Sequence, residues 1–135
     1  MLEYHEHDAQ DVIELIVNGR VERARYEAIR GKTEQFIARR GRARLLEVIE
    51  DIGPVDPAVL WEDTAFAFRH WDDFSRIAVV TKEKWLSAVL AALQAIFAGE
   101  VKAFTLDQCE EAWNWLTEHA VDKSGEPVCG KKRAT

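Results

Sequence analysis

The hydrophobic and polar positions along the chain predict strands that alternate with helices. Short runs of branched apolar residues are typical of buried strands, and longer stretches repeat apolar residues at helical spacing. The expected strands cover residues 2–7, 11–17, 44–50, 76–80 and 101–106. The expected helices cover residues 22–40, 57–71 and 84–97, and a fourth begins at Asp107. The order is therefore β-β-α-β-α-β-α-β-α, and the first two strands form a hairpin.

This order predicts an α/β fold with four main helices and a mostly parallel five-stranded sheet. Parallel strands are joined by right-handed helical crossovers, and continuous apolar runs such as residues 77–80 suit a sheet interior. A chain of 135 residues is long enough for one domain with a core of its own. We expect the domain to cover residues 1–120 and residues 121–135 to form a polar, flexible C-terminal tail.

Several residues are placed to begin or end the helices. Gly41 follows the first helix at the position of a C-terminal cap. Asp56 and Pro57 suit the cap and the first position of the second helix. Asp107 and Glu110 have the spacing of a capping box at the start of the fourth helix.

The two central helices are apolar around most of their girth, and such helices have to be covered on more than one side. The cover is a second copy of the chain, another protein or an apolar small molecule. We expect a homodimer, because contiguous apolar surface marks interaction sites. The expected interface residues are Leu60, Phe66, Phe68, Leu90, Leu93 and Phe97.

A small ligand pocket is the alternative use of the same helices. Ligands of open α/β sheets bind beyond the carboxyl ends of the strands. Trp61 and Trp85 open the two central helices near two such ends, with Asp51 and Thr81 as polar anchors. The competing interpretation, which we favour, places both tryptophans in the core or in the dimer contact.

The net charge of −6 conceals a basic segment. Residues 20–44 contain nine Lys or Arg and three acidic residues, so the rest of the chain is strongly acidic. The segment lacks the interleaved aromatic residues and the known motif of a nucleic-acid binder. We therefore interpret it as a solvated helix face beside an acidic body, and expect no nucleic-acid partner.

His70 with Asp72 and Asp73 suggests acid–base chemistry, although no nucleophile accompanies it at a defined spacing. A histidine in the last turn of a helix also stabilises the helix dipole, and we favour this structural role. His5 and His7 share one face of a strand, but no set of further ligands is evident. No catalytic residue, metal site or cofactor is predicted.

The two cysteines, Cys109 and Cys129, give no disulfide framework, and Cys109 is expected to be an inert, half-buried thiol. A reducing cytoplasm is the expected location. The N-terminus lacks the pattern of a secretory signal, and no apolar run reaches the roughly 20 residues of a membrane span. Stable membrane insertion is therefore not expected.

Three stretches resemble one known family. They are residues 18–21 with Tyr26 and Glu27, residues 60–85 with the motif His70-Trp71-Asp72-Asp73, and residues 101–104 with 112–116. Together they cover about residues 11–118. The chain resembles the SpoIIAA-like proteins of the STAS type, whose fold is that of bacterial anti-sigma factor antagonists. The likeness is greatest to a branch of small bacterial proteins of undescribed function.

The resemblance implies a βα superhelix and a non-enzymatic regulatory or protein-interaction module. Because lipid-carrying Sec14-type domains share this fold, it also implies an alternative, a carrier of an apolar or lipid-like ligand. An enzyme that uses His70 is the third possibility. In anti-sigma factor antagonists the loop after the third strand carries a phosphorylated Ser or Thr, whereas residues 51–57 contain no hydroxyl. We therefore expect no phosphoswitch there, and we interpret Asp56 as a helix cap.

Overall fold

A five-stranded sheet forms the centre of the protein. The computed structural model describes residues 1–51, 73–82, 99–122 and 124–129, and between 83 and 98 it describes Lys84, Ala88, Ala91 and Gln94. The strands follow one another across the sheet in the order β1-β2-β3-β4-β5. They are β1 (Leu2–His7), β2 (Val12–Asn18), β3 (Ala43–Asp51), β4 (Phe74–Thr81) and β5 (Glu100–Phe104).

The sheet is mixed. β1 pairs with β2 in an antiparallel hairpin, whereas β2, β3, β4 and β5 pair with one another in parallel. The sequence correctly predicted five strands and the hairpin. Its description of the sheet as mostly parallel needs correction, because the hairpin strand β1 gives the sheet an antiparallel edge.

Two α-helices lie within the described part of the chain, α1 (Arg23–Arg40) and α4 (Cys109–Leu116). The predicted helix 57–71 lies outside the described residues. Of the predicted helix 84–97, the four described residues are helical. Of the four main helices that were predicted, the structure therefore describes two as complete elements. None of its helices is long and apolar enough to cross a membrane.

Helix α1 matches its prediction closely. It ends at Gly41, whose φ of 83° suits glycine and whose N–H donates to the Ile37 carbonyl at 2.7 Å. Its basic residues pair with acidic neighbours: Arg39 contacts Glu6, and Arg40 contacts Asp11. The basic residues at the end of α1 therefore lie beside acidic residues of the first hairpin.

The start of α4 differs from its prediction. A 3-10 turn, η3 (Leu106–Gln108), precedes the helix, and the capping box joins Thr105 to Gln108. The Thr105 hydroxyl also donates to Asp107, the residue predicted as the cap. Thr105 takes the capping role because its backbone is extended while Asp107 is already within the turn.

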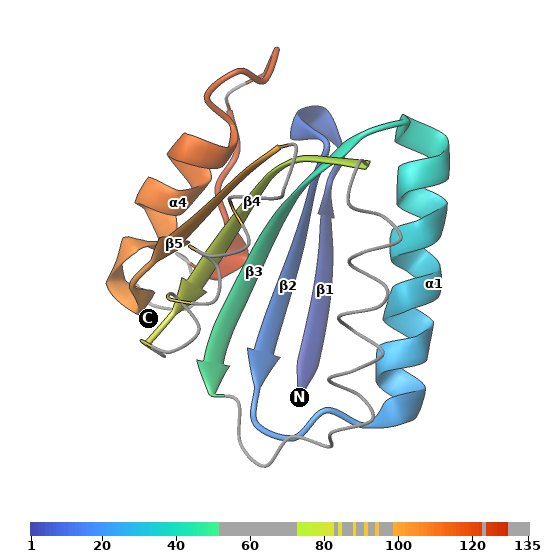
Figure 1. Cartoon of the computed structure of the whole chain (residues 1–135). Coiled ribbons are helices and arrows are strands. Elements are labelled where there is room, and N and C mark those ends of the chain that lie inside the picture. The colour runs from blue at the N-terminus through green and yellow to red at the C-terminus, as the bar shows by residue number, and fades with distance from the viewer. Residues whose placement is uncertain are drawn as a thin grey trace.

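Alternate side chains of the strands point to opposite faces of the sheet. One face packs against α4 through Val12, Ile16, Leu46 and their neighbours, and the other packs against α1 through Ile13 and Phe36. Figure 1 shows α1 on one side of the sheet, and α4 with the C-terminal segment on the other. The described part of the chain therefore forms three layers, with the sheet between α1 and α4 (Figure 1).

The two cysteines form a disulfide, which overturns the sequence prediction of free thiols. Cys109 and Cys129 are joined with a Cα–Cα distance of 6.1 Å, well within the ordinary range. Both residues are buried in the core on the α4 face. Residues 124–129, predicted as part of a flexible tail, instead contact the sheet, since Pro127 and Cys129 are buried.

Tyr4 gives the hairpin an expected alkaline sensitivity. Burial of its ring, and then the 2.6 Å hydrogen bond that its hydroxyl donates to Glu6, raise the pKa of Tyr4 well above its ordinary value. Above about pH 10 the unfolded chain releases this proton and the folded protein keeps it, so stability falls as the pH rises.

We expect Tyr4→Phe to reduce this loss of stability between about pH 9 and 11. Urea denaturation of both proteins across that range measures the difference in slope. An identical pH dependence in the two proteins would contradict this assignment.

Candidate functional site

The predicted site at the carboxyl ends of the strands is only partly described. Asp51 and Thr81 are the last residues of β3 and β4, so they lie at that edge of the sheet as predicted. Trp61 and Trp85 lie outside the described residues, as do His70 and all six predicted interface residues. The pocket of Trp61 and Trp85 and the homodimer therefore stay predictions.

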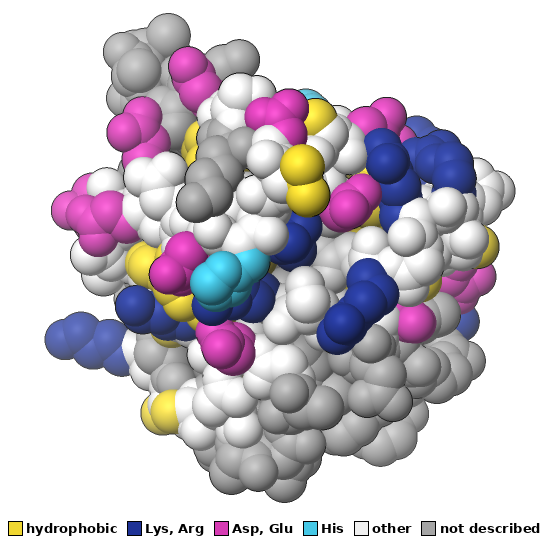
Figure 2. Space-filling model, turned by 90° about the horizontal axis from the view of Figure 1, so that it is seen from above, with side chains coloured by type: hydrophobic (Ala, Val, Ile, Leu, Met, Phe, Trp, Pro, Cys, Tyr) yellow, Lys and Arg dark blue, Asp and Glu magenta, His cyan; other side chains and the backbone are white. Residues whose placement is uncertain are grey.

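A pocket of about 320 Å³ lies at the opposite edge, where β3, β4 and β5 begin. We call it the amino-end pocket. Figure 2 looks onto this end of the molecule, where Lys and Arg side chains alternate with acidic ones and a histidine lies among them. The lining residues are Arg42, Arg44, Ser75, Arg76, Gly99, Glu100, Leu116 and His119.

The strand register brings the charged residues of the pocket together. Arg44 of β3 pairs with Arg76 of β4, and Arg76 pairs with Glu100 of β5. Because paired residues of neighbouring strands share a face, these three side chains form a row on the face that α4 covers. Gln94 holds the start of β5 in place. Its side-chain oxygen accepts from Val101 N–H at 2.6 Å, and its side-chain NH₂ donates to the Gly99 carbonyl.

Arg76 is the most firmly held charged side chain of the pocket, and it is only 13% exposed. Nη1 donates to the Trp115 carbonyl at 2.5 Å and to Glu118 at 3.0 Å, and Nη2 lies 3.0 Å from a Glu100 oxygen. The guanidinium also lies 4.7 Å from the centre of the Trp115 ring. Arg76 thus joins β4, β5 and the end of α4, and shapes the wall that Leu116 forms.

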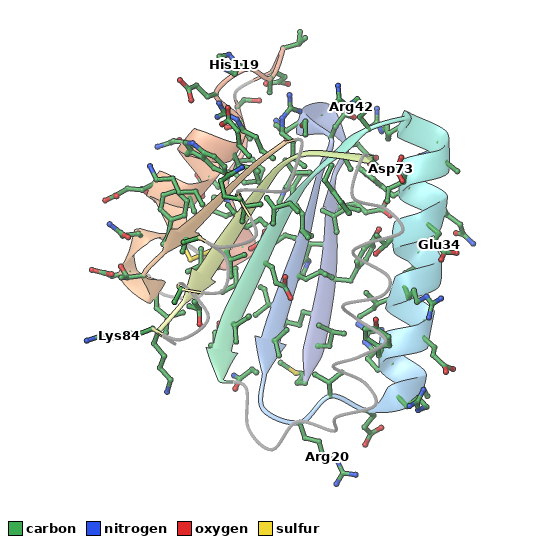
Figure 3. The ribbon with its side chains drawn as sticks, viewed as in Figure 1. Arg20, Glu34, Arg42, Asp73, Lys84 and His119 are labelled. Atoms are coloured by element: carbon green, nitrogen blue, oxygen red, sulfur yellow. A yellow bond between two sulfur atoms is a disulfide. The ribbon has the colours of Figure 1, made fainter. Side chains whose placement is uncertain are left out.

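The other basic residues that line the pocket have N–H donors left over. Arg44 uses Nη1 for the Gln10 carbonyl, 2.7 Å away. Arg42 and His119 are exposed, and neither makes a hydrogen bond or ion pair with another residue in the described ranges. Arg42 and His119 lie at the same end of the molecule, and Arg20 lies at the opposite end (Figure 3).

The pocket has the composition of an anion site. Three arginines, a histidine and Ser75 line it together with Glu100, and Glu118 adds a second carboxylate through its contact with Arg76. Guanidinium groups bind carboxylate and phosphate through paired, charge-assisted hydrogen bonds. No group of three or more His, Cys, Asp or Glu suited to a metal ion occurs among the residues that the structure describes.

The sequence analysis missed this pocket, although it had noticed the arginines. It interpreted the basic segment as a solvated helix face and gave its arginines no role at the sheet, whereas Arg42 directly precedes β3 and Arg44 lies at its second position. A recognisable signal was present: basic residues stand at the start of two buried strands, in Arg42-Ala43-Arg44 and in Ser75-Arg76. Parallel strands bring such residues to one edge of the sheet.

The comparisons with known proteins agree with the fold. The family model described as SpoIIAA-like matches residues 12–117, and the chain belongs to this family. The comparison with curated proteins finds no match. A solved structure of similar fold is that of an uncharacterized protein of the DUF3478 family, with a SpoIIAA-like fold, from Shewanella loihica PV-4. It is 18% identical, with a TM-score of 0.67 over 86% of this chain and 92% of that chain.

Proposed function

We propose that this protein is a non-enzymatic regulatory or interaction module that binds an anionic group, a carboxylate or a phosphate, in the amino-end pocket. Membership of the SpoIIAA-like family supports the general class, a regulatory or interaction module of STAS type. The row of Arg44, Arg76 and Glu100 supports the specific chemistry, because Glu100 and Glu118 both pair with Arg76, and Arg44 is left beside them with donors that no carboxylate of the described ranges uses. This row is the observation that carries the proposal.

The sequence supports an anion as ligand in a second way. Residues 51–57 have no Ser or Thr, so this chain lacks the phosphorylatable hydroxyl that its family resemblance leads one to expect in that loop. A module with no phosphorylatable hydroxyl in this loop can recognise an anion by another means. A pocket of arginines supplies one, since it recognises the charge on the ligand.

Titration with inorganic phosphate and with citrate tests the proposal. We expect saturable binding with a Kd below about 10 mM for at least one of them, which calorimetry measures. Arg42→Ala removes an exposed donor at the mouth of the pocket and weakens binding about tenfold. A preference for citrate identifies a carboxylate site, and a preference for phosphate identifies a phosphate site.

Arg20→Ala is the matched control, because Arg20 is also an exposed arginine but lies at the far end of the molecule (Figure 3). It removes the same charge without touching the pocket, so we expect unchanged affinity. Equal weakening by both substitutions would show a general charge effect. That result, or the absence of saturable binding to wild-type protein, would refute the proposal.

A further inference from the structure

Residues 124–129, which we call the strap, return from the end of α4 to the sheet. Figure 1 shows this part of the chain beside α4, on the face of the sheet opposite α1. At its start, the Ser124 carbonyl accepts a hydrogen bond from the side chain of Gln10 at 2.6 Å. At its end, Val128 packs against the core and Cys129 is fully buried within it. The strap is therefore held at both ends.

A buried carboxylate receives the strap. Glu14 lies on β2 between Val12 and Ile16, and all three residues are inaccessible to solvent. The N–H groups of Val128 and Cys129 donate to its two oxygens at 2.8 and 2.9 Å. His7 Nε2 lies 2.9 Å from the oxygen that Val128 contacts. Because a buried carboxylate without partners is very unfavourable, Glu14 strongly favours the docked strap.

The disulfide adds a covalent restraint to these contacts. Cys109 is the first residue of α4, Cys129 belongs to the strap, and the bond closes a loop with a sequence separation of 20. Closing such a loop restricts the undocked chain much more than the docked one. The docked state is therefore favoured while the disulfide is intact, and less so after its reduction.

Gln10 connects the strap to the amino-end pocket. Its side chain donates to Ser124 of the strap, and its backbone carbonyl accepts from Arg44 of the pocket. Gln10 is itself buried. His119 of the pocket precedes the strap by only a few residues, and buried Ala120 follows it directly. When the strap undocks, Gln10 loses its contact with Ser124, so Arg44 is held less firmly. His119 is also held less firmly, because it lies close to the strap in the chain.

We propose that the Cys109–Cys129 disulfide is a redox latch, which keeps the strap docked and so maintains the anion affinity of the amino-end pocket. The part that concerns affinity rests on the proposed function. A small dithiol donates two electrons and two protons to the S–S bond, so that two thiols form and the dithiol becomes a disulfide. Both cysteines are nearly inaccessible, so the reductant acts when the strap opens transiently.

Hydrogen exchange of the strap tests the latch without any ligand. We expect the amides of Val128 and Cys129 to exchange about tenfold faster, or more, after dithiothreitol reduces the protein. The double variant Cys109→Ser, Cys129→Ser should exchange at the reduced rate and should not respond to dithiothreitol, which controls for other effects of the reagent. Equal exchange in oxidised and reduced wild-type protein would overturn the latch.

Titration with inorganic phosphate tests the coupling to the pocket. We expect reduction to weaken binding at least about threefold, and Gln10→Ala to diminish this difference. Faster exchange with unchanged affinity would overturn the coupling and leave only the latch. If oxidised wild-type protein binds no anion, the proposed function fails and the coupling with it, whereas the exchange experiment still decides the latch.

Discussion

Replacement of Glu14 by alanine is expected to destabilise the protein by about 3–5 kcal/mol, because it removes the partner of several buried polar groups at once. In the native protein this fully buried carboxylate accepts the N–H groups of Val128 and Cys129 and lies beside His7. Alanine leaves both amides and the imidazole without an acceptor in an apolar layer. The loss is a large fraction of the stability of a typical domain.

Urea denaturation with the disulfide intact measures this effect. Glu14→Gln is the informative partner variant, since it keeps the shape and one carbonyl oxygen but directs an NH₂ group toward a backbone donor; we expect an intermediate loss. Glu27→Ala is the control, because Glu27 is an exposed member of an i,i+4 ion pair with Arg23 and should cost less than about 1 kcal/mol. A loss at Glu14 no larger than at Glu27 would refute the role of the buried carboxylate.

Replacement of Arg76 by methionine is expected to cost about 2–3 kcal/mol and to abolish measurable anion binding. Methionine fills much of the same volume. It leaves the Trp115 carbonyl without its donor and removes the ion pairs with Glu100 and Glu118. The end of α4 then loses its polar contacts with β4, although Leu116 still packs against the sheet. Thermal unfolding and phosphate titration measure the two effects separately.

Two variants make this test specific. Arg76→Lys keeps the charge but cannot reach all three acceptors in one planar fork, so we expect it to recover only part of the stability. Arg39→Met makes the same chemical change at a more exposed arginine, whose contacts to Glu6 and Asp8 are at the surface, and should cost less than about 1 kcal/mol. Full recovery by lysine would show that charge alone accounts for the role of Arg76.

Local patterns predicted most of the described fold. The apolar runs located the five strands within a few residues, and helical spacing with Gly41 located α1. These features depend on near neighbours in the chain, which the sequence displays directly. The capping box before α4 was misplaced because Thr105 and Asp107 both suit the capping role, and only the backbone conformation decides between them.

The contacts that build the pocket and the strap join distant parts of the chain. The sequence does not display the register that aligns Arg44 with Arg76, nor the return of Cys129 to Cys109. One signal was nevertheless available: Glu14 is the only charged residue in the apolar run Val12–Val17. A charged residue at such a position requires a buried partner, and here that partner is the strap.

The length of helix α4 limits the distance between the disulfide and the amino-end pocket. It has eight residues, which corresponds to a rod about 12 Å long. Cys109 is its first residue, and Leu116, which lines the amino-end pocket, is its last. The disulfide and the amino-end pocket thus lie at opposite ends of one short helix, so no large domain movement is needed for a change at one to reach the other.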